Sequence, residues 1–187
     1  MAEPPFLTDR LVLRKWREDD LALWLAHLNT PAVRAYLGGV QSQEAVATRF
    51  AQVLSAWDAD GFSFLAVERR DDGEFLGTCG IARVSNEPAP EPLASGLQVG
   101  WQMRQEAWGE GYTTEAARAI MAYAFAALEQ DIMWAQTSER NRGSWAVMAK
   151  LGMSRRAELD YFDPAYPPED NPAMVWSITR QAWEAHT

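Results

Sequence analysis

The sequence predicts a mixed α/β fold in a single domain that spans residues 1–187. Hydrophobic residues make up 48% of the chain, enough for one core, and the length fits one domain. Short segments with the apolar pattern of strands are interspersed with longer segments whose apolar residues recur every three or four positions. Their order is strand, helix, helix, three strands, helix, strand, helix and two strands. It predicts about four helices packed on a sheet of about six to seven strands.

The first quarter of the chain predicts one strand and two helices. Arg10–Arg14 has the apolar core of a strand, and the apolar residues of 19–28 follow the i, i+3, i+4, i+7 spacing of a helix. A second helix is expected to begin after Ser42, because serine is a favoured N-cap. It is expected to end before Asp60-Gly61, a pair typical of turns.

The next segment predicts three consecutive strands. The ranges 62–69 and 74–84 are strand-like and are joined by Asp71-Asp72-Gly73. Asp-Gly between apolar runs favours a hairpin, since glycine tolerates the positive φ of such turns. The segment 85–95 holds three prolines and is predicted to be a loop, and 96–103 is the third strand.

The following residues predict a helix, a strand and a second helix. The apolar face of 113–128 has helical periodicity, 131–137 is strand-like, and 142–151 is predicted to be a shorter helix. Gly152 is expected to close that helix in the left-handed conformation, with an apolar residue after it.

Two strands are predicted near the end of the chain, at 156–161 and 173–179. The segment 163–172 between them is rich in proline, so it is expected to be a loop. We expect this loop to face the substrate.

Composition narrows the cellular and chemical classes. The longest apolar run, 120–128, is far below the roughly 20 residues that cross a bilayer, and the N-terminus lacks the pattern of a secretory signal, so the expected location is cytoplasmic. Cys79 is the single cysteine and lies in a predicted strand, which favours a buried thiol over a catalytic one. With His27 and His186 alone, no cluster has metal-ligand spacing, so no metal is expected.

The charge distribution argues against some partners. A net charge of −9 argues against binding of nucleic acid, because proteins that bind its phosphates carry a basic face. The same charge permits a cationic substrate. Residues 138–156 are a local exception with five basic residues and one acidic residue. This basic segment fits either a bound anion or a solvated helix face.

Two motifs have the composition of binding loops. The first is a strand ending near Met103, a short segment with Gly109 and Gly111, and a helix start. Glycines let the backbone approach an anion, and a helix N-terminus adds partial positive charge, so this segment can bind a diphosphate. The second begins at Asn141, a natural N-cap, with Ser144 in the first turn of the helix. Alone, it favours simple capping and packing over a role in binding.

Taken in order, these motifs resemble the GNAT superfamily of N-acetyltransferases. The resemblance rests on Trp-Gly-x-Gly-Tyr-x-Thr-Glu-Ala from Trp108, Asn-x-x-Ser from Asn141, and Lys-Leu-Gly-Met from Lys150. Within the superfamily the chain looks most like the branch that includes the ribosomal-protein N-terminal acetyltransferases, because 7–20 and 75–80 are similar to its first strand, first helix and third strand. The likeness runs from about residue 7 to 180. It implies a mostly antiparallel sheet that splays apart at the cofactor site.

The resemblance also implies roles for individual residues. Acetyl-CoA would be the cosubstrate, with its pantetheine arm along the backbone of Gln102 and Met103 and a hydrogen bond to Asn141. Ser144 would lie near the thioester sulfur as a proton donor for the leaving thiolate. The amides that would hold the pyrophosphate are those of Trp108, Gly109, Glu110, Gly111, Tyr112 and Thr113.

The basic segment would then contribute Arg142 or Lys150 near the 3′-phosphate of coenzyme A. Glu106 departs from the family pattern, because relatives often have Arg or Gln there. A carboxylate is unfavourable beside a diphosphate, so Glu106 is expected to point to solvent.

A second departure concerns the general base. Relatives often have Glu where this chain has Gln98, and an amide cannot accept the proton of the amine. The remaining hypotheses are Glu68, Asp160 or Tyr161, a water relay, or an acceptor that arrives already deprotonated.

The predicted function is transfer of an acetyl group from acetyl-CoA to an amine, either a protein N-terminus or a small molecule. The alternative is a non-catalytic module that binds acyl-CoA as a sensor, which the glutamine at position 98 favours. A purely structural α/β domain is a third reading. Members of the superfamily are often dimers, so a homodimer is possible by resemblance.

Overall fold

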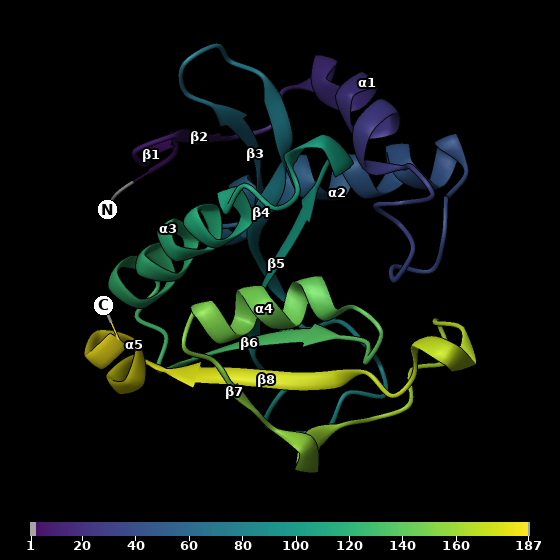
Figure 1. The fold of residues 1–187 in the computed structure, drawn as a ribbon, viewed down its shortest axis with the longest axis vertical. Helices are drawn as coiled ribbons and strands as arrows, with labels where there is room; N and C mark the ends of the chain where they lie inside the picture. Colours follow the sequence, from purple (N-terminus) through teal and green to yellow (C-terminus); the bar gives the residue numbers. More distant parts are fainter. Residues whose placement is uncertain (1–2, 187) are drawn as a thin grey trace.

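The computed structural model describes residues 3–186, which form an eight-stranded sheet (Figure 1). The strand order is β1-β2-β3-β4-β5-β6-β8-β7, and every neighbouring pair is antiparallel except β5 with β6. The mostly antiparallel sheet is therefore confirmed. The strands are β1 (Phe6–Leu7), β2 (Leu11–Arg14), β3 (Phe64–Arg69), β4 (Phe75–Arg83), β5 (Leu97–Met103), β6 (Ile132–Thr137), β7 (Ser154–Arg155) and β8 (Met174–Thr179).

All four predicted helices are present among the described residues. The helix expected over 19–28 changes character: a 3₁₀ turn precedes α1, and a π-helical turn follows it. The α-helices are α1 (Leu21–Leu23), α2 (Gln43–Asp60), α3 (Tyr112–Ala127), α4 (Arg142–Lys150) and α5 (Arg180–His186). No helix within residues 3–186 is both long and apolar enough to span a bilayer.

Local signals in the sequence act as predicted. The Ser42 side chain accepts a hydrogen bond from the Ala45 amide at 3.2 Å and caps α2. Gly152 closes α4 with a φ of 76°. Asp72, in the hairpin between β3 and β4, accepts from the Glu74 amide at 3.1 Å.

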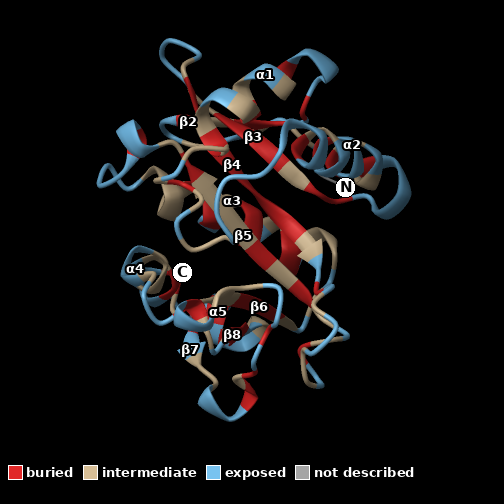
Figure 2. Cartoon of the chain, turned by 90° about the vertical axis from the view of Figure 1, so that its right-hand side faces the viewer, coloured by how far each residue is buried: buried red, intermediate tan, exposed pale blue. Residues whose placement is uncertain are grey.

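The sheet separates two apolar cores, because successive side chains of a strand point to opposite faces. Leu65 and Val67 of β3 pack in the core under α3, whereas Ala66 between them packs with α2 and the segment around α1. We call these the α3 face and the α2 face. Figure 2 shows the central strands buried, with α2 along one side.

The division into two faces continues in the other half of the sheet, beyond the single pairing of β5 with β6 among the described residues. Met133 and Ala135 of β6 join the core under α3, together with Met148 of α4. Trp134 lies between them and points the other way, into a third cluster with Tyr161 and Val175. Both halves of the sheet therefore have an α3 face, which α3 and α4 cover (Figure 1).

The strand predicted at 156–161 is wrong. The strand β7 lies two residues earlier, and Ala157–Leu159 forms a 3₁₀ turn instead. The Arg155 guanidinium bonds both to the Asp160 carboxylate and to the Val175 carbonyl, at 3.1 Å for the latter, which folds the chain back on itself. The strand β1 and the helix α5 were not predicted, because both are short.

Candidate active site

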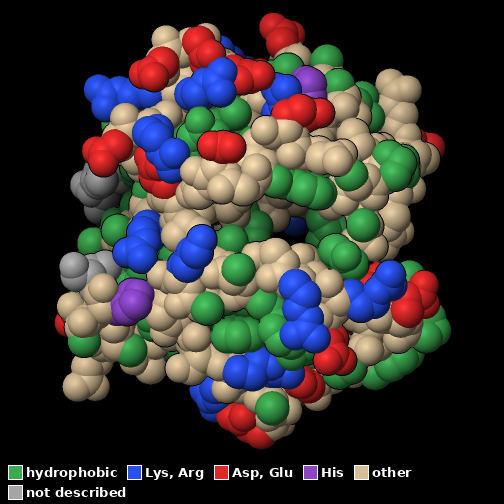
Figure 3. Space-filling model, in the orientation of Figure 1, with side chains coloured by type: hydrophobic (Ala, Val, Ile, Leu, Met, Phe, Trp, Pro, Cys, Tyr) green, Lys and Arg blue, Asp and Glu red, His purple; other side chains and the backbone are tan. Residues whose placement is uncertain are grey.

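A cleft passes through the sheet where β5 and β6 separate. Within residues 3–186 these two parallel strands pair at Gln98 and Trp134 alone, so they diverge beyond that point. The space between them belongs to a cleft of about 1100 Å³. Figure 3 shows the surface hollowed between the two halves of the molecule, with Lys and Arg side chains beside the hollow. The predicted splay of the sheet is thus present.

The cleft is lined from both faces of the sheet. Val99 and Met103 of β5 pack into the core on the α3 face. Gln98 and Gln102, which alternate with them, therefore face α2. Gln98, Gln102 and Met103 all line the cleft, which connects the two faces at this gap.

The predicted diphosphate loop forms the wall on the α3 face. After β5 the chain makes a 3₁₀ turn, and Gly111 then caps α3. Gly109 and Gly111 have φ values of 84° and 81°, which side-chain-bearing residues rarely adopt. Trp108 donates from Nε1 to the Met103 carbonyl at 2.8 Å and holds the loop against the strand end. Trp108, Gly109, Gly111 and Thr113 line the cleft.

Two residues of the predicted loop face away from the cleft. Glu110 and Tyr112 line a separate depression on the other side of the loop. The Arg10 guanidinium donates to the Glu110 carbonyl at 3.1 Å and lies 4.6 Å from the centre of the Tyr112 ring. The Glu110 carbonyl and the Tyr112 ring thus anchor the loop to the β1–β2 region.

Glu106 points to solvent, as predicted. Its side chain is 68% exposed and pairs with Arg104 at 3.1 Å. A backbone hydrogen bond and the bond from Arg104 lower the pKa of its carboxyl group. Glu106 does not line the cleft.

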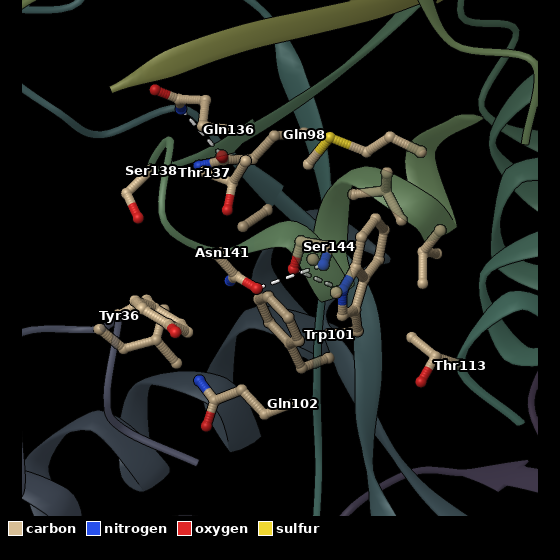
Figure 4. A pocket seen from close by; sticks show the side chains of 18 of the residues that line it. Tyr36, Gln98, Trp101, Gln102, Thr113, Gln136, Thr137, Ser138, Asn141 and Ser144 are labelled. Atoms are coloured by element: carbon tan, nitrogen blue, oxygen red, sulfur yellow. Dashed lines mark hydrogen bonds between the residues drawn. The ribbon is translucent and has the colours of Figure 1, made fainter. Parts of the chain in front are cut away.

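The second motif places Asn141 and Ser144 at the N-terminus of α4 (Figure 4). The Asn141 side chain accepts from the Ser144 amide at 3.2 Å, so it is the N-cap. The Ser144 hydroxyl oxygen accepts from Trp101 Nε1 at 3.3 Å. That bond uses a lone pair of the oxygen, which leaves the hydroxyl proton available to a group in the cleft.

The basic segment divides in two. Arg140, Arg142 and Lys150 line the cleft. Arg155 and Arg156 instead pair with Asp160 and Glu158. Three cations therefore face the cleft, while the other two fold the segment after β7.

Two of the suggested general bases lie outside the cleft lining. Glu68 pairs with Arg14 at 2.6 Å, and Asp160 pairs with Arg155. Neither residue lines the cleft, because each carboxylate is held elsewhere by a guanidinium.

Tyr161 does line the cleft, as part of a hydrogen-bonded chain of three side chains. Its hydroxyl donates to Gln136 Oε1, and Gln136 Nε2 donates to Gln98 Oε1 at 2.9 Å. Burial, the charge of Asp163 and the proximity of Tyr166 raise the pKa of Tyr161. A phenol with a raised pKa stays protonated near neutrality, so Tyr161 can donate a proton but is a poor base.

Several cleft residues were not predicted one by one. The loop predicted to face the substrate contributes Asp163, Tyr166, Asp170 and Asn171 to the cleft lining. Gln136 was not singled out, because nothing in a short strand distinguishes a glutamine that meets Gln98 from one that meets water.

Cys79 is fully buried in β4 and outside the cleft lining, as predicted. Burial raises the pKa of its thiol, which keeps it protonated. No group of three or more His, Cys, Asp or Glu side chains among the described residues could hold a metal ion.

Two polar atoms of the cleft are buried without a hydrogen-bond partner among residues 3–186, Gln102 Oε1 and Ser138 Oγ. Both residues line the cleft. Buried polar groups in proteins are nearly always bonded, so this pattern fits a site completed by a polar ligand. With the exposed glycine loop and the cations, the cleft suits an extended anionic molecule such as acetyl-CoA.

Comparison with known proteins agrees with this geometry. Residues 10–154 match the model of an acetyltransferase (GNAT) domain, so the chain belongs to the GNAT acetyltransferase family. It is an enzyme that transfers an acetyl group from acetyl-CoA to an amine.

Relatives cover most of the chain. The uncharacterized protein YkkB of Bacillus subtilis is 30% identical over 160 residues, 81% of this chain and 86% of that protein. An acetyltransferase structure from Agrobacterium tumefaciens has a TM-score of 0.77 at 26% identity, covering 96% of each chain. A Vibrio cholerae structure, provisionally assigned as a ribosomal-protein-serine acetyltransferase, has a TM-score of 0.70 at 17% identity, covering 95% of this chain and 99% of that one.

Proposed function

We propose that acetyl-CoA binds from the α3 face and that the acceptor amine reaches its thioester from the α2 face. The observation that carries this proposal is the cleft itself, which crosses the sheet where β5 and β6 separate. The diphosphate loop and Ser144 lie on one side of the gap. Gln98 and Tyr161 lie on the other.

The loop backbone is the proposed diphosphate site. The amides of Trp108, Gly109, Gly111 and Thr113 border the cleft at the N-terminus of α3, where partial positive charge favours an anion. Glu110 and Tyr112 contribute at most their amides, since both residues line the separate depression on the other side of the loop.

The pantetheine arm is proposed to run along the free edge of β5 at Gln102 and Met103, within reach of Asn141. Arg142 and Lys150, both exposed on α4 beside the cleft, are proposed to attract the 3′-phosphate.

Acetyl-CoA supplies an acetyl group on a thioester, whose C–S bond is replaced by a C–N bond to the amine. The amine must lose a proton, and the leaving sulfur must gain one. We assign protonation of the leaving sulfur to the Ser144 hydroxyl, which Trp101 holds in place at the N-terminus of α4. Free amides of β5 in the gap would stabilise the negative charge that develops on the carbonyl oxygen.

For the proton of the amine, the cleft offers no carboxylate at position 98. A water bonded to the chain of Gln98, Gln136 and Tyr161 is therefore the proposed relay. An acceptor that arrives neutral would need no relay.

The acceptor is proposed to be either a protein N-terminus or a small-molecule amine. The likeness to the ribosomal-protein branch favours a protein N-terminus. The Vibrio cholerae structure gives that acceptor limited support, since 17% identity indicates the fold alone.

A homodimer and a cytoplasmic location stay predictions of the sequence. The molar mass in solution tests the homodimer, and localisation of a tagged chain tests the cytoplasmic location.

Acetyl-CoA binding is tested with a matched pair of variants. Gly109 and Gly73 both have positive φ, and a Cβ at either position meets no atom within 4 Å. Gly109→Trp and Gly73→Trp therefore carry similar backbone strain, but only the first fills the cleft. At 100 times its Kd, acetyl-CoA should stabilise the wild type and Gly73→Trp by about 2.7 kcal/mol in thermal unfolding, and Gly109→Trp far less. Equal stabilisation of both variants would disprove the loop assignment.

The role of Ser144 is tested by Ser144→Ala. We expect kcat to fall about 100-fold, because the leaving thiolate loses its proton donor, while the affinity for acetyl-CoA is kept. Ser144→Thr keeps the hydroxyl and should recover part of the rate. A rate within twofold of the wild type in Ser144→Ala would remove Ser144 from the chemistry.

A further inference from the structure

The acceptor end of the cleft contains a buried carboxylate without a cation. Asp163 is 3% exposed and lines the cleft. Its carboxylate accepts from Asn86 Nδ2 at 2.7 Å and from the Ala165 amide at 2.9 Å. No Lys, Arg or His side chain among residues 3–186 forms an ion pair with it.

Guanidinium groups in and around the cleft bond to groups other than Asp163. Arg140 pairs with Asp170 at 3.4 Å, and Arg83 pairs with Asp60 at 2.9 Å. Arg34 donates to the backbone carbonyls of Leu37 and Gly39, the latter at 2.9 Å. Arg49 also lines the cleft and donates to Gln52 Oε1 at 3.4 Å, and none of these four residues forms an ion pair with Asp163.

Two tyrosines lie close to Asp163. Burial, and next the proximity of Asp163, raise the pKa of Tyr161 and of Tyr166, whereas Arg34 and Arg49 lower the pKa of Tyr166. An isolated buried carboxylate is costly, and proteins normally pair it with a cation. Two neutral hydrogen bonds offset only part of that cost.

A second polar group near this end also lacks a partner. Ser138 is 6% exposed, and its hydroxyl oxygen has no hydrogen-bond partner among the described residues. Ser138 follows β6, at the edge where Thr137 pairs with Met174 and Tyr161 bridges to Ala173. Figure 4 shows Ser138 near Gln136 in the cleft lining. The cleft thus offers a carboxylate and a hydroxyl to a ligand.

We propose that the acceptor carries two amines and that Asp163 binds the ammonium that does not react. This inference rests on the proposed function and specifies its substrate class, a small dicationic amine. A carboxylate in contact with the reacting amine would favour its protonated form and oppose attack on the thioester. Within residues 3–186, the Asp163 oxygens bond to Asn86 and Ala165 and not to the chain of Gln98, Gln136 and Tyr161 beside the gap.

The loop holds Asp163 in place before any ligand arrives. The Asn171 side chain accepts from the Asp163 amide at 2.7 Å and donates to the Asp163 carbonyl at 3.1 Å. The same Nδ2 lies within bonding distance of the Tyr166 and Pro167 carbonyls. Little side-chain or loop freedom is therefore lost when a cation binds.

The test compares acceptors that differ in one charge. Acetylation of 1,4-diaminobutane is measured against 4-amino-1-butanol, and 1,5-diaminopentane against 5-amino-1-pentanol. We expect the wild type to favour the diamine by about 10- to 100-fold in kcat/KM, the range of a charged hydrogen bond. Asp163→Asn should bring that ratio close to one through a lower kcat/KM for the diamine, with the affinity for acetyl-CoA unchanged.

Two further variants separate charge from structure. Asp60→Asn removes a cleft carboxylate that Arg83 already neutralises, so the preference for the diamine should stay. Asp163→Glu keeps the charge and should keep the preference, even if Asp163→Asn folds poorly. A wild type without preference, or an Asp163→Asn variant that retains it or loses both acceptors equally, would overturn the inference.

Binding separates this inference from the proposed function. Calorimetry of 1,4-diaminobutane with the protein saturated in coenzyme A needs no turnover. If no amine is acetylated but the diamine binds the wild type at least tenfold more tightly than Asp163→Asn, the dicationic site stands and the proposed reaction fails. If monoamines and diamines are acetylated equally, the reaction stands and the site is refuted.

Discussion

Asp20 beside α1 and Asp163 in the cleft are both buried, at 7% and 3% exposure, but their surroundings differ. Asp20 receives two hydrogen bonds from the Arg14 guanidinium, the shorter at 2.6 Å, and Arg14 also binds Glu68. Asp163 receives two neutral hydrogen bonds and has no ion pair within residues 3–186. The first carboxylate is neutralised within the chain. The second is left for a ligand to neutralise.

The contrast follows from where each group lies. Arg14 ends β2, and its guanidinium lies between Asp20 and Glu68, each carboxylate within 2.6 Å. Such a cluster can tie the first helical segment to β2 and β3. Asp163 follows a strand bridge at the rim of a cleft, where pairing with an internal cation would block the site.

The largest effect is expected from Arg14→Met. The change leaves Asp20 and Glu68 close together without their shared cation, and breaking a buried pair in this way costs about 3–5 kcal/mol. Urea unfolding at pH 7 measures the loss. Asp163→Asn is the matched change at the cleft, and it should alter the free energy of unfolding by less than about 1 kcal/mol or increase it, because an unneutralised charge is removed. Equal losses in both variants would mean that Asp163 is structural.

The same contrast shows how far the sequence alone can go. Ser42 and Gly152 were predicted correctly, because caps depend on neighbours within one turn. Asp163 could be assigned to a loop facing the substrate, but its partner Asn86 lies 77 positions away. No sequence pattern near either residue predicts the hydrogen bond between them.

The active site divides along the same line. The diphosphate loop and the pair Asn141–Ser144 are contiguous motifs, and the structure puts both at the cleft. The chain of Gln98, Gln136 and Tyr161 comes from three separate elements, and its side chains meet only because β6 leaves β5 after one pairing. The strand predicted over 156–161 failed for a related reason. Its alternation suits a strand, but the bond from Arg155 to Asp160 closes a turn there.

The smallest expected effect is on the free energy of unfolding at acidic pH. Burial by itself would raise the pKa of Asp20, but bonds from the Arg14 side chain and the Arg17 amide, with the charge of Arg14, lower it below 3.8. A carboxylate whose folded pKa is lowered stabilises the protein above its unfolded pKa, and this contribution disappears as the pH falls through the folded value. Each unit of difference is worth about 1.4 kcal/mol. The wild type should therefore lose more stability than Asp20→Asn as the pH falls from about 5 to 3.

Urea unfolding across that range measures the difference between the two slopes, and Asp20→Glu is the control because it keeps a carboxylate beside Arg14. A steeper slope in the wild type and in Asp20→Glu than in Asp20→Asn would tie the acid sensitivity to the paired carboxylate. Identical slopes in all three proteins would mean that Arg14 does not hold Asp20 ionised. The statement that Arg14 neutralises Asp20, on which the contrast with Asp163 depends, would then be wrong.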